Sequence, residues 1–114
     1  MNSVFRTFIR MVPRAAEAIR SILDTRHRLA ALQEEIAERQ QAFDRLAVVQ
    51  TRYRENIATL RATRGQAQEV RRLASELLAR EAQLGEVERS LSEMRSRAAG
   101  LQTELNDRIG KAEF

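Results

Sequence analysis

The chain has no cysteine, no tryptophan and a single proline among its 114 residues. Without cysteine it can form neither disulfides nor thiolate metal sites, and a reducing compartment such as the cytoplasm is the expected location. Aromatic residues make up only 4% of the chain, which supplies too few large apolar side chains for a compact globule of this length. No apolar run approaches the roughly 20 residues that a membrane-spanning helix needs.

Alanine, leucine, arginine, glutamate and glutamine dominate, a composition typical of long helices and coiled coils. Charged residues make up 32% of the chain, and the net charge is +4. The positive charge is concentrated in two segments. Residues 1–21 carry four arginines against Glu17, and residues 52–72 carry six arginines against Glu55 and Glu69. The composition predicts one all-α domain with two basic regions.

Apolar residues recur with the 3.5-residue period of a coiled coil in both halves of the chain. In the first half the a positions are Ile22, Leu29, Ile36, Phe43, Gln50 and Ile57, and the d positions are Thr25, Leu32, Arg39, Leu46, Tyr53 and Leu60. In the second half the a positions are Val70, Leu77, Leu84, Leu91, Ala98 and Leu105, and the d positions are Leu73, Arg80, Val87, Met94, Leu101 and Arg108. The two frames are one residue out of phase, and the break falls near Gly65, a strong helix breaker.

The phase break has two interpretations. A continuous helix in a straight parallel oligomer absorbs it by local over- or underwinding. Alternatively the chain reverses at Gly65, with glycine in the left-handed conformation that ends many helices. An antiparallel pair centred there makes each a position face a d position, such as Ile57 with Leu73, and places Gln50 opposite Arg80 in a polar layer where each can partner the other.

We therefore predict a long antiparallel two-helix coiled-coil hairpin with its turn near Gly65. The hairpin covers residues 14–110, with arms at about 14–62 and 67–110, and residues 111–114 form a tail. Leu23, Val48 and Leu78 are apolar residues outside the seam. They indicate a further helix-packing face, on which a homodimer could form a four-helix bundle.

Residues 1–13 form a basic leader outside the hairpin pattern. Asn2 or Ser3 can cap a short amphipathic helix, and Pro13 suits the first position of the next helix, so we expect a hinge there. Four interpretations stay open: packing back on the hairpin, docking on an anionic membrane surface, insertion into a groove of a protein partner, or a cleavable targeting segment. The apolar residues on one face of the leader are Val4, Phe5, Phe8, Ile9 and Val12.

The second basic segment surrounds the predicted turn. Its arginines can be solvated and paired locally, can meet an acidic protein surface, or can contact nucleic acid. Nucleic acid is the least favoured partner, because the only aromatic residue nearby, Tyr53, falls in the seam rather than on a stacking platform. The arginines closest to the turn are Arg61, Arg64, Arg71 and Arg72.

No catalytic, cofactor-binding or metal-binding arrangement is visible. His27, the only histidine, falls at an outward heptad position. Acid pairs such as Glu34 and Glu35 lie on a helix without a cleft, and paired carboxylates do acid–base work only where burial separates their pKa values. We expect a protein that is not an enzyme and that binds no cofactor or metal.

The segment around the turn resembles the hairpin region of the FliJ/YscO stalk proteins of type III export. The resemblance covers about a third of the chain, and the second tyrosine that this family carries after the glutamate is absent. It implies a stalk that inserts into the pore of a hexameric export ATPase and links it to the export gate. The residues that carry the resemblance are Leu46, Tyr53-Arg54-Glu55, Leu60, Gly65, Leu73, Leu77-Leu78-Ala79 and Leu84.

The leading hypothesis is a non-enzymatic structural or assembly module. It would bridge or space protein partners in a larger complex through its apolar, basic leader and its arginine-rich turn. An export stalk is one alternative, and a coiled coil that binds a membrane surface or nucleic acid is another.

Overall fold

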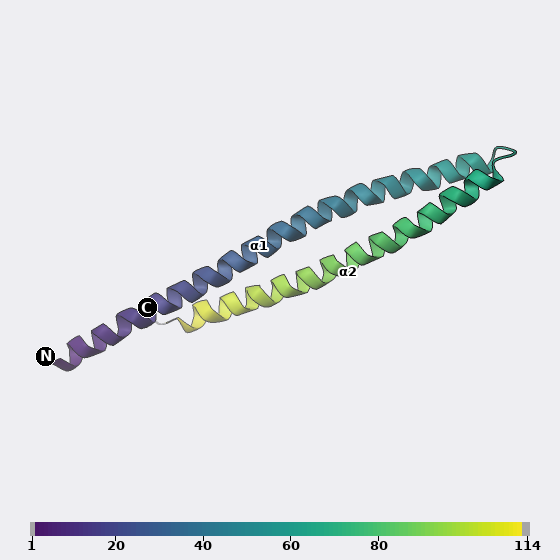
Figure 1. Ribbon diagram of the computed structural model, residues 1–114. Coiled ribbons are helices and arrows are strands. Elements are labelled where there is room, and N and C mark those ends of the chain that lie inside the picture. The colour runs from purple at the N-terminus through teal and green to yellow at the C-terminus, as the bar shows by residue number, and fades with distance from the viewer. Residues whose placement is uncertain (1, 113–114) are drawn as a thin grey trace. The chain divides into compact units, whose positions relative to one another are not determined.

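The computed structural model describes the backbone of residues 2–112 and the side chains of Arg6 and residues 12–112. This part of the chain forms two helices, α1 (Asn2–Arg61) and α2 (Ala67–Lys111), and contains no strand (Figure 1). The predicted all-α hairpin is confirmed. The first arm ends and the second begins within one residue of the predicted positions.

Gly65 provides the turn between the helices. Its φ is +82°, and among the described residues no other has a positive φ. Glycine adopts this conformation without the steric cost that a Cβ imposes. The Thr63 amide donates to the Leu60 carbonyl at 3.1 Å, and the Val70 amide donates to the Gln66 carbonyl at 2.9 Å, which is the first hydrogen bond of α2. The reversal predicted from the phase break is therefore confirmed.

The predicted hinge at Pro13 is wrong, because Pro13 lies inside α1 and the helix continues through it. Proline removes one backbone hydrogen bond, but its φ is close to the helical value. Ala15, Ala16 and Ala18 follow, and alanine is the strongest helix former. The backbone of residues 2–13 thus extends the first arm.

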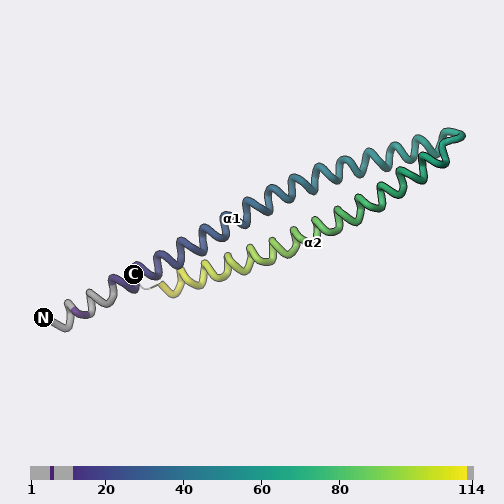
Figure 2. Tube along the Cα trace, viewed as in Figure 1, coloured from purple at the N-terminus to yellow at the C-terminus, as the bar shows by residue number. Residues whose placement is uncertain are grey.

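The chain divides into two compact units that are described separately. The turn unit is Glu35–Met94, and the terminal unit combines Met1–Glu34 with Arg95–Phe114. In each unit α1 and α2 run antiparallel (Figure 2). Side-chain bonds between the helices join residues placed almost symmetrically about Gly65: Arg39 with Ser90 in the turn unit, and Arg108 with Ser21 in the terminal unit.

All the buried side chains of the described residues lie at predicted seam positions. The turn unit buries Gln50, Ile57, Leu91 and Met94. The terminal unit buries Thr25, Leu29, Leu32 and Leu105. The seam prediction is confirmed in both units.

Candidate binding surfaces

A polar layer interrupts the seam of the turn unit, but its bonds differ from the prediction. Gln50 is 3% exposed, and its Nε2 donates to the Leu77 carbonyl at 3.3 Å rather than pairing with Arg80. Arg80 Nη2 instead donates to the Tyr53 hydroxyl at 3.1 Å, and its Cζ lies 4.5 Å from the centre of that ring. The aromatic face and the hydroxyl attract the guanidinium together. Gln50 Oε1 is left buried without a partner among the described residues.

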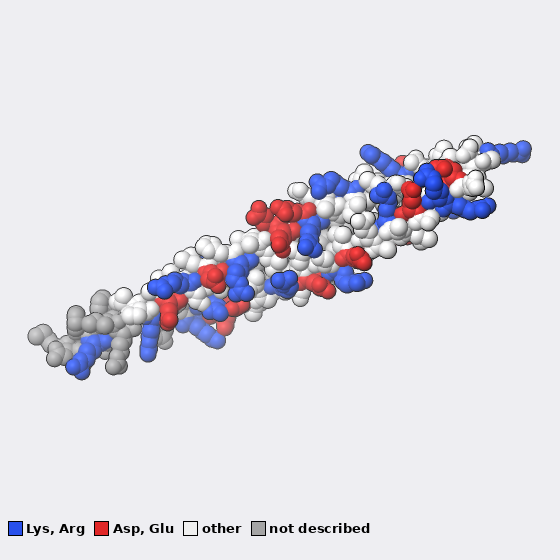
Figure 3. All heavy atoms as spheres, in the orientation of Figure 1, with Lys and Arg blue, Asp and Glu red and all other residues white. Residues whose placement is uncertain are grey.

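The arginines around the turn are exposed, and Figure 3 shows Lys and Arg atoms gathered over the turn end of the hairpin. Arg61 ends α1, Arg64 precedes Gly65, and Arg71 lies in the first turns of α2. No hydrogen bond or ion pair joins Arg61, Arg64 or Arg71 to another described residue. Three unpaired guanidinium groups therefore project from the turn.

Arg72 differs from these three because two carboxylates neutralise it. It forms an ion pair with Glu69 and another with Glu76, the latter at 2.8 Å between Nη1 and Oε1. The hydrogen bond from Arg72 lowers the pKa of the Glu69 carboxyl below its ordinary value. The expected local pairing is thus confirmed at Arg72. Arg54 pairs with Glu81 of the other helix at 3.0 Å.

A shallow hollow of about 380 Å³ lies at the turn. Its apolar lining comes from Leu60 and Val70, and two of the unpaired arginines, Arg61 and Arg71, also line it. An apolar floor beside cationic groups suits a partner that offers an apolar side chain next to carboxylates. The remaining lining residues are Thr63, Gly65, Gln66 and Ala67.

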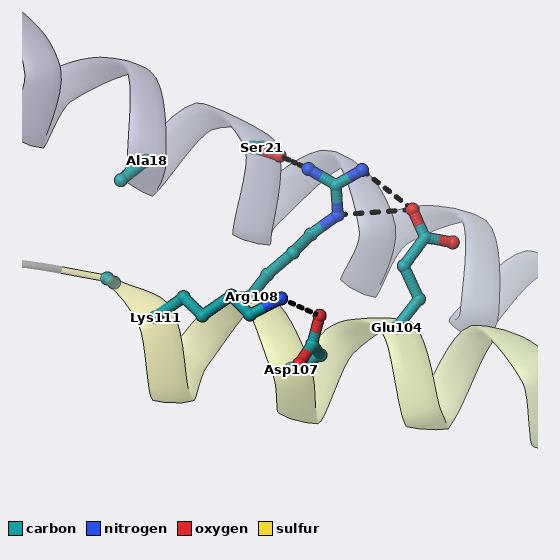
Figure 4. Close-up of a pocket in the computed structure, with 7 residues that line it drawn as sticks. Ala18, Ser21, Glu104, Asp107, Arg108 and Lys111 are labelled. Atoms are coloured by element: carbon teal, nitrogen blue, oxygen red, sulfur yellow. Dashed lines mark hydrogen bonds and ion pairs between the residues drawn. The ribbon is translucent and has the colours of Figure 1, made fainter.

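One flank of the terminal unit is polar and internally paired. There the C-terminal end of α2 lies beside Ala18 and Ser21 of α1 (Figure 4). Arg108 hydrogen-bonds Ser21 and forms an ion pair with Glu104 at 2.7 Å. Lys111 pairs with Asp107 at 3.0 Å, so the charges of this flank satisfy one another.

Large apolar side chains are exposed elsewhere in the terminal unit. Val12, Ile19 and Leu23 of α1 are 52%, 46% and 45% exposed, and Ile109 of α2 is 49% exposed. Sequence reasoning selected Val12 and Leu23 but missed Ile19 and Ile109, whose e positions beside the seam were the available signal. The leader side chains Val4, Phe5, Phe8 and Ile9 lie outside the described side chains.

The turn unit exposes fewer large apolar side chains. Val48 is 53% exposed and Leu78 is 67% exposed, as expected from their positions outside the seam. His27 in the terminal unit is exposed, in agreement with its predicted outward position.

Within the described residues, no group of three or more His, Asp or Glu side chains is placed to hold a metal ion. Neither α1 nor α2, over its described residues, has a stretch apolar enough to cross a membrane. Comparisons with protein families, curated proteins and solved structures found no match.

Proposed function

We propose that this protein is a non-enzymatic assembly module that bridges or spaces partners through two surfaces. The first is the turn surface, formed by Arg61, Arg64, Arg71 and the hollow that Arg61 and Arg71 line. The second is the N-terminal part of α1, with its apolar face and its arginines. The unpaired arginines at the turn are the observation that carries the proposal, because nearby carboxylates neutralise Arg54 and Arg72 but leave these three free.

An acidic protein surface is the proposed partner of the turn. Exposed guanidinium groups without partners form bidentate bonds with carboxylates and steer association with acidic surfaces. The apolar floor of the hollow adds a contact that a bare phosphate backbone cannot use. Nucleic acid is therefore the less favoured partner of this surface.

Photocrosslinking in cells tests this surface. A photoreactive residue in place of Thr63, which lines the hollow, should yield a discrete protein adduct. The same residue in place of exposed Arg89, in the same unit, should not. Reversing charge with Arg61→Glu/Arg64→Glu/Arg71→Glu should abolish the adduct, whereas Arg45→Glu/Arg89→Glu should leave it. Equal adducts at both positions would contradict the proposal, and a nucleic-acid adduct would favour the alternative.

A stalk for a hexameric export ATPase is the second candidate. It is supported by the helical hairpin with its glycine turn, together with the resemblance around Tyr53, Gly65 and Leu77. The expected result is co-purification with such an ATPase, and the charge reversal at the turn should weaken it. Failure of the complex to form with purified components would remove this candidate.

A further inference from the structure

The N-terminal part of α1 has more apolar surface than α2 can cover. Between residues 4 and 23 every a, b, d and e heptad position is apolar, while the c, f and g positions hold polar residues or Pro13. This pattern gives an apolar arc of about 160° on the helical wheel, whereas packing against one helix needs only the a and d positions. The twelve apolar residues are Val4, Phe5, Phe8, Ile9, Met11, Val12, Ala15, Ala16, Ala18, Ile19, Ile22 and Leu23.

The large described side chains in the outer half of this arc, at the b and e positions, are exposed. The b and e positions form a stripe that follows Phe5, Ile9, Val12, Ala16, Ile19 and Leu23. Its large described members, Val12, Ile19 and Leu23, are each about half exposed, whereas Leu29 at the next a position is 6% exposed. The stripe ends after Leu23, because the next e position is Arg26. It is therefore a local feature rather than a general property of α1.

The polar side of the same segment is cationic. Residues 4–23 contain four arginines but only one acidic residue, Glu17. The arginines are Arg6, Arg10, Arg14 and Arg20. Arg6, Arg14 and Arg20 are exposed and have no ion-pair partner among the described residues. Arg6 and Arg20 occupy f positions, at the edge of the apolar arc, where an arginine can bury its stem and extend its guanidinium outward.

We propose that residues 4–23 of α1 bind an anionic lipid bilayer, with the stripe from Phe5 to Leu23 lying in the headgroup region. This names the partner of the second surface of the proposed assembly module and rests on that proposal. A wide apolar arc bordered by arginines is the pattern of helices that lie in the plane of a bilayer. Anionic headgroups supply the negative charge that the segment lacks.

A second copy of the chain is the main competitor for the stripe. It would bring an equal excess of arginine against the first copy, with only Glu17 of each segment to offset it. A coiled-coil contact would also use a narrower stripe than the arc that is present. Charge and arc width therefore favour the lipid surface.

Vesicle binding by the full chain tests the proposal. The chain should co-sediment with vesicles of phosphatidylcholine and phosphatidylserine but much less with phosphatidylcholine alone, and salt should weaken binding. Ile19→Gln/Leu23→Gln should lower the partition coefficient about tenfold or more. Val48→Gln/Leu78→Gln, matched in chemistry and exposure in the turn unit, should change it less than about twofold. Circular dichroism should show the helix content of the parent in both variants.

The orientation of the helix can be tested separately. Tryptophan in Ile19→Trp should shift its emission to shorter wavelength on the anionic vesicles, and tryptophan in Leu78→Trp should not. Absence of vesicle binding would overturn the proposal. It would equally be overturned if the lipid-free chain sediments as a dimer that Ile19→Gln/Leu23→Gln converts to monomer. Neither outcome affects crosslinking at the turn, so failure of the lipid proposal is distinguishable from failure of the proposed function.

Discussion

Each unit has a seam of a and d positions, and the two seams depart from the apolar pattern in different ways. In the terminal unit the apolar residues exceed what the seam can hold, and Ile19, Leu23 and Ile109 remain on the surface. In the turn unit a cross-helix polar layer interrupts the seam, because Gln50 bonds to the Leu77 carbonyl and Arg80 bonds to Tyr53. Surplus apolar surface favours a further partner, whereas a polar layer lowers stability and fixes the register of the helices. The same heptad repeat thus leaves apolar side chains exposed beside the seam in the terminal unit and buries a polar layer in the turn unit.

Truncating a buried aliphatic side chain should give the largest change in the free energy of unfolding. Making this change in each unit tests whether the two seams contribute equally to stability. Leu29→Ala in the terminal unit and Ile57→Ala in the turn unit remove side chains that are 6% and 5% exposed. Each should lower the free energy of unfolding by about 2–4 kcal/mol, measured by urea denaturation. Leu78→Ala, at a 67% exposed position, should stay within about 0.5 kcal/mol of the parent. Similar losses at all three positions would refute the seam as the source of stability.

Replacing glycine by alanine should change the free energy of unfolding in opposite directions at the turn and within the helices. Gly65→Ala should destabilise by about 1–2 kcal/mol, since an L-residue with a Cβ is strained at a φ of +82°. Gly85→Ala in the turn unit and Gly100→Ala in the terminal unit add a methyl group with no other atom within 4 Å, leaving aside the surrounding helix backbone. Each should stabilise by about 0.5–1 kcal/mol because alanine restricts the unfolded chain. Thermal unfolding measures all three, and equal signs at Gly65 and Gly85 would contradict the assigned turn.

Replacing the buried polar residue of each unit by an apolar one tests whether that residue lowers the stability of its seam. Gln50→Leu should raise the free energy of unfolding by about 1 kcal/mol, because it removes the unpartnered Oε1 from the turn unit. Thr25→Val in the terminal unit should change it by less than about 0.5 kcal/mol, since the Thr25 hydroxyl bonds within its own helix, to the Ser21 carbonyl at 2.9 Å. Destabilisation by Gln50→Leu would show that the bond to Leu77 outweighs the unpartnered oxygen.

The smallest expected effect is the pH dependence at the start of α2. The pKa of Glu69 is lowered in the folded protein by its hydrogen bond from Arg72. The stability from this contact is therefore present above the ordinary carboxyl pKa and is lost as pH falls through the lowered value. NMR titration should return the pKa of Glu69 toward its ordinary value in Arg72→Gln. The same titration in Arg61→Gln, which removes an unpaired arginine, should match the parent.

Periodicity predicted the parts of this molecule that depend on the backbone. The heptad frames and Gly65 were sufficient for the antiparallel pairing, because registration is set by which residues must be buried together. They could not assign partners within a layer, where the ring and hydroxyl of Tyr53 attract Arg80 away from Gln50. The hinge at Pro13 failed for a related reason. One lost hydrogen bond is a local cost, and the alanines that follow favour a continuous helix.

The binding surfaces were predicted only in part. Arginine counts located the turn surface, but ion pairing decided which of its arginines are free, and Arg72 is not. The leader face and Leu23 were predicted from the sequence, but the exposed side chains Ile19 and Ile109, at e positions beside the seam, were missed. The proposed binding surfaces consist of residues that the seam does not need.

The position of Gly65 also orders the folding of the chain. The bond between Gln50 and Leu77 closes 27 residues, whereas the bond between Arg108 and Ser21 closes 87. Closing the longer loop directly costs about 1 kcal/mol more in chain entropy, so helix pairing should begin beside the turn and proceed layer by layer toward the chain ends. The terminal unit, in which Val12, Ile19 and Leu23 are exposed on α1, should then be the last part of the hairpin to pair.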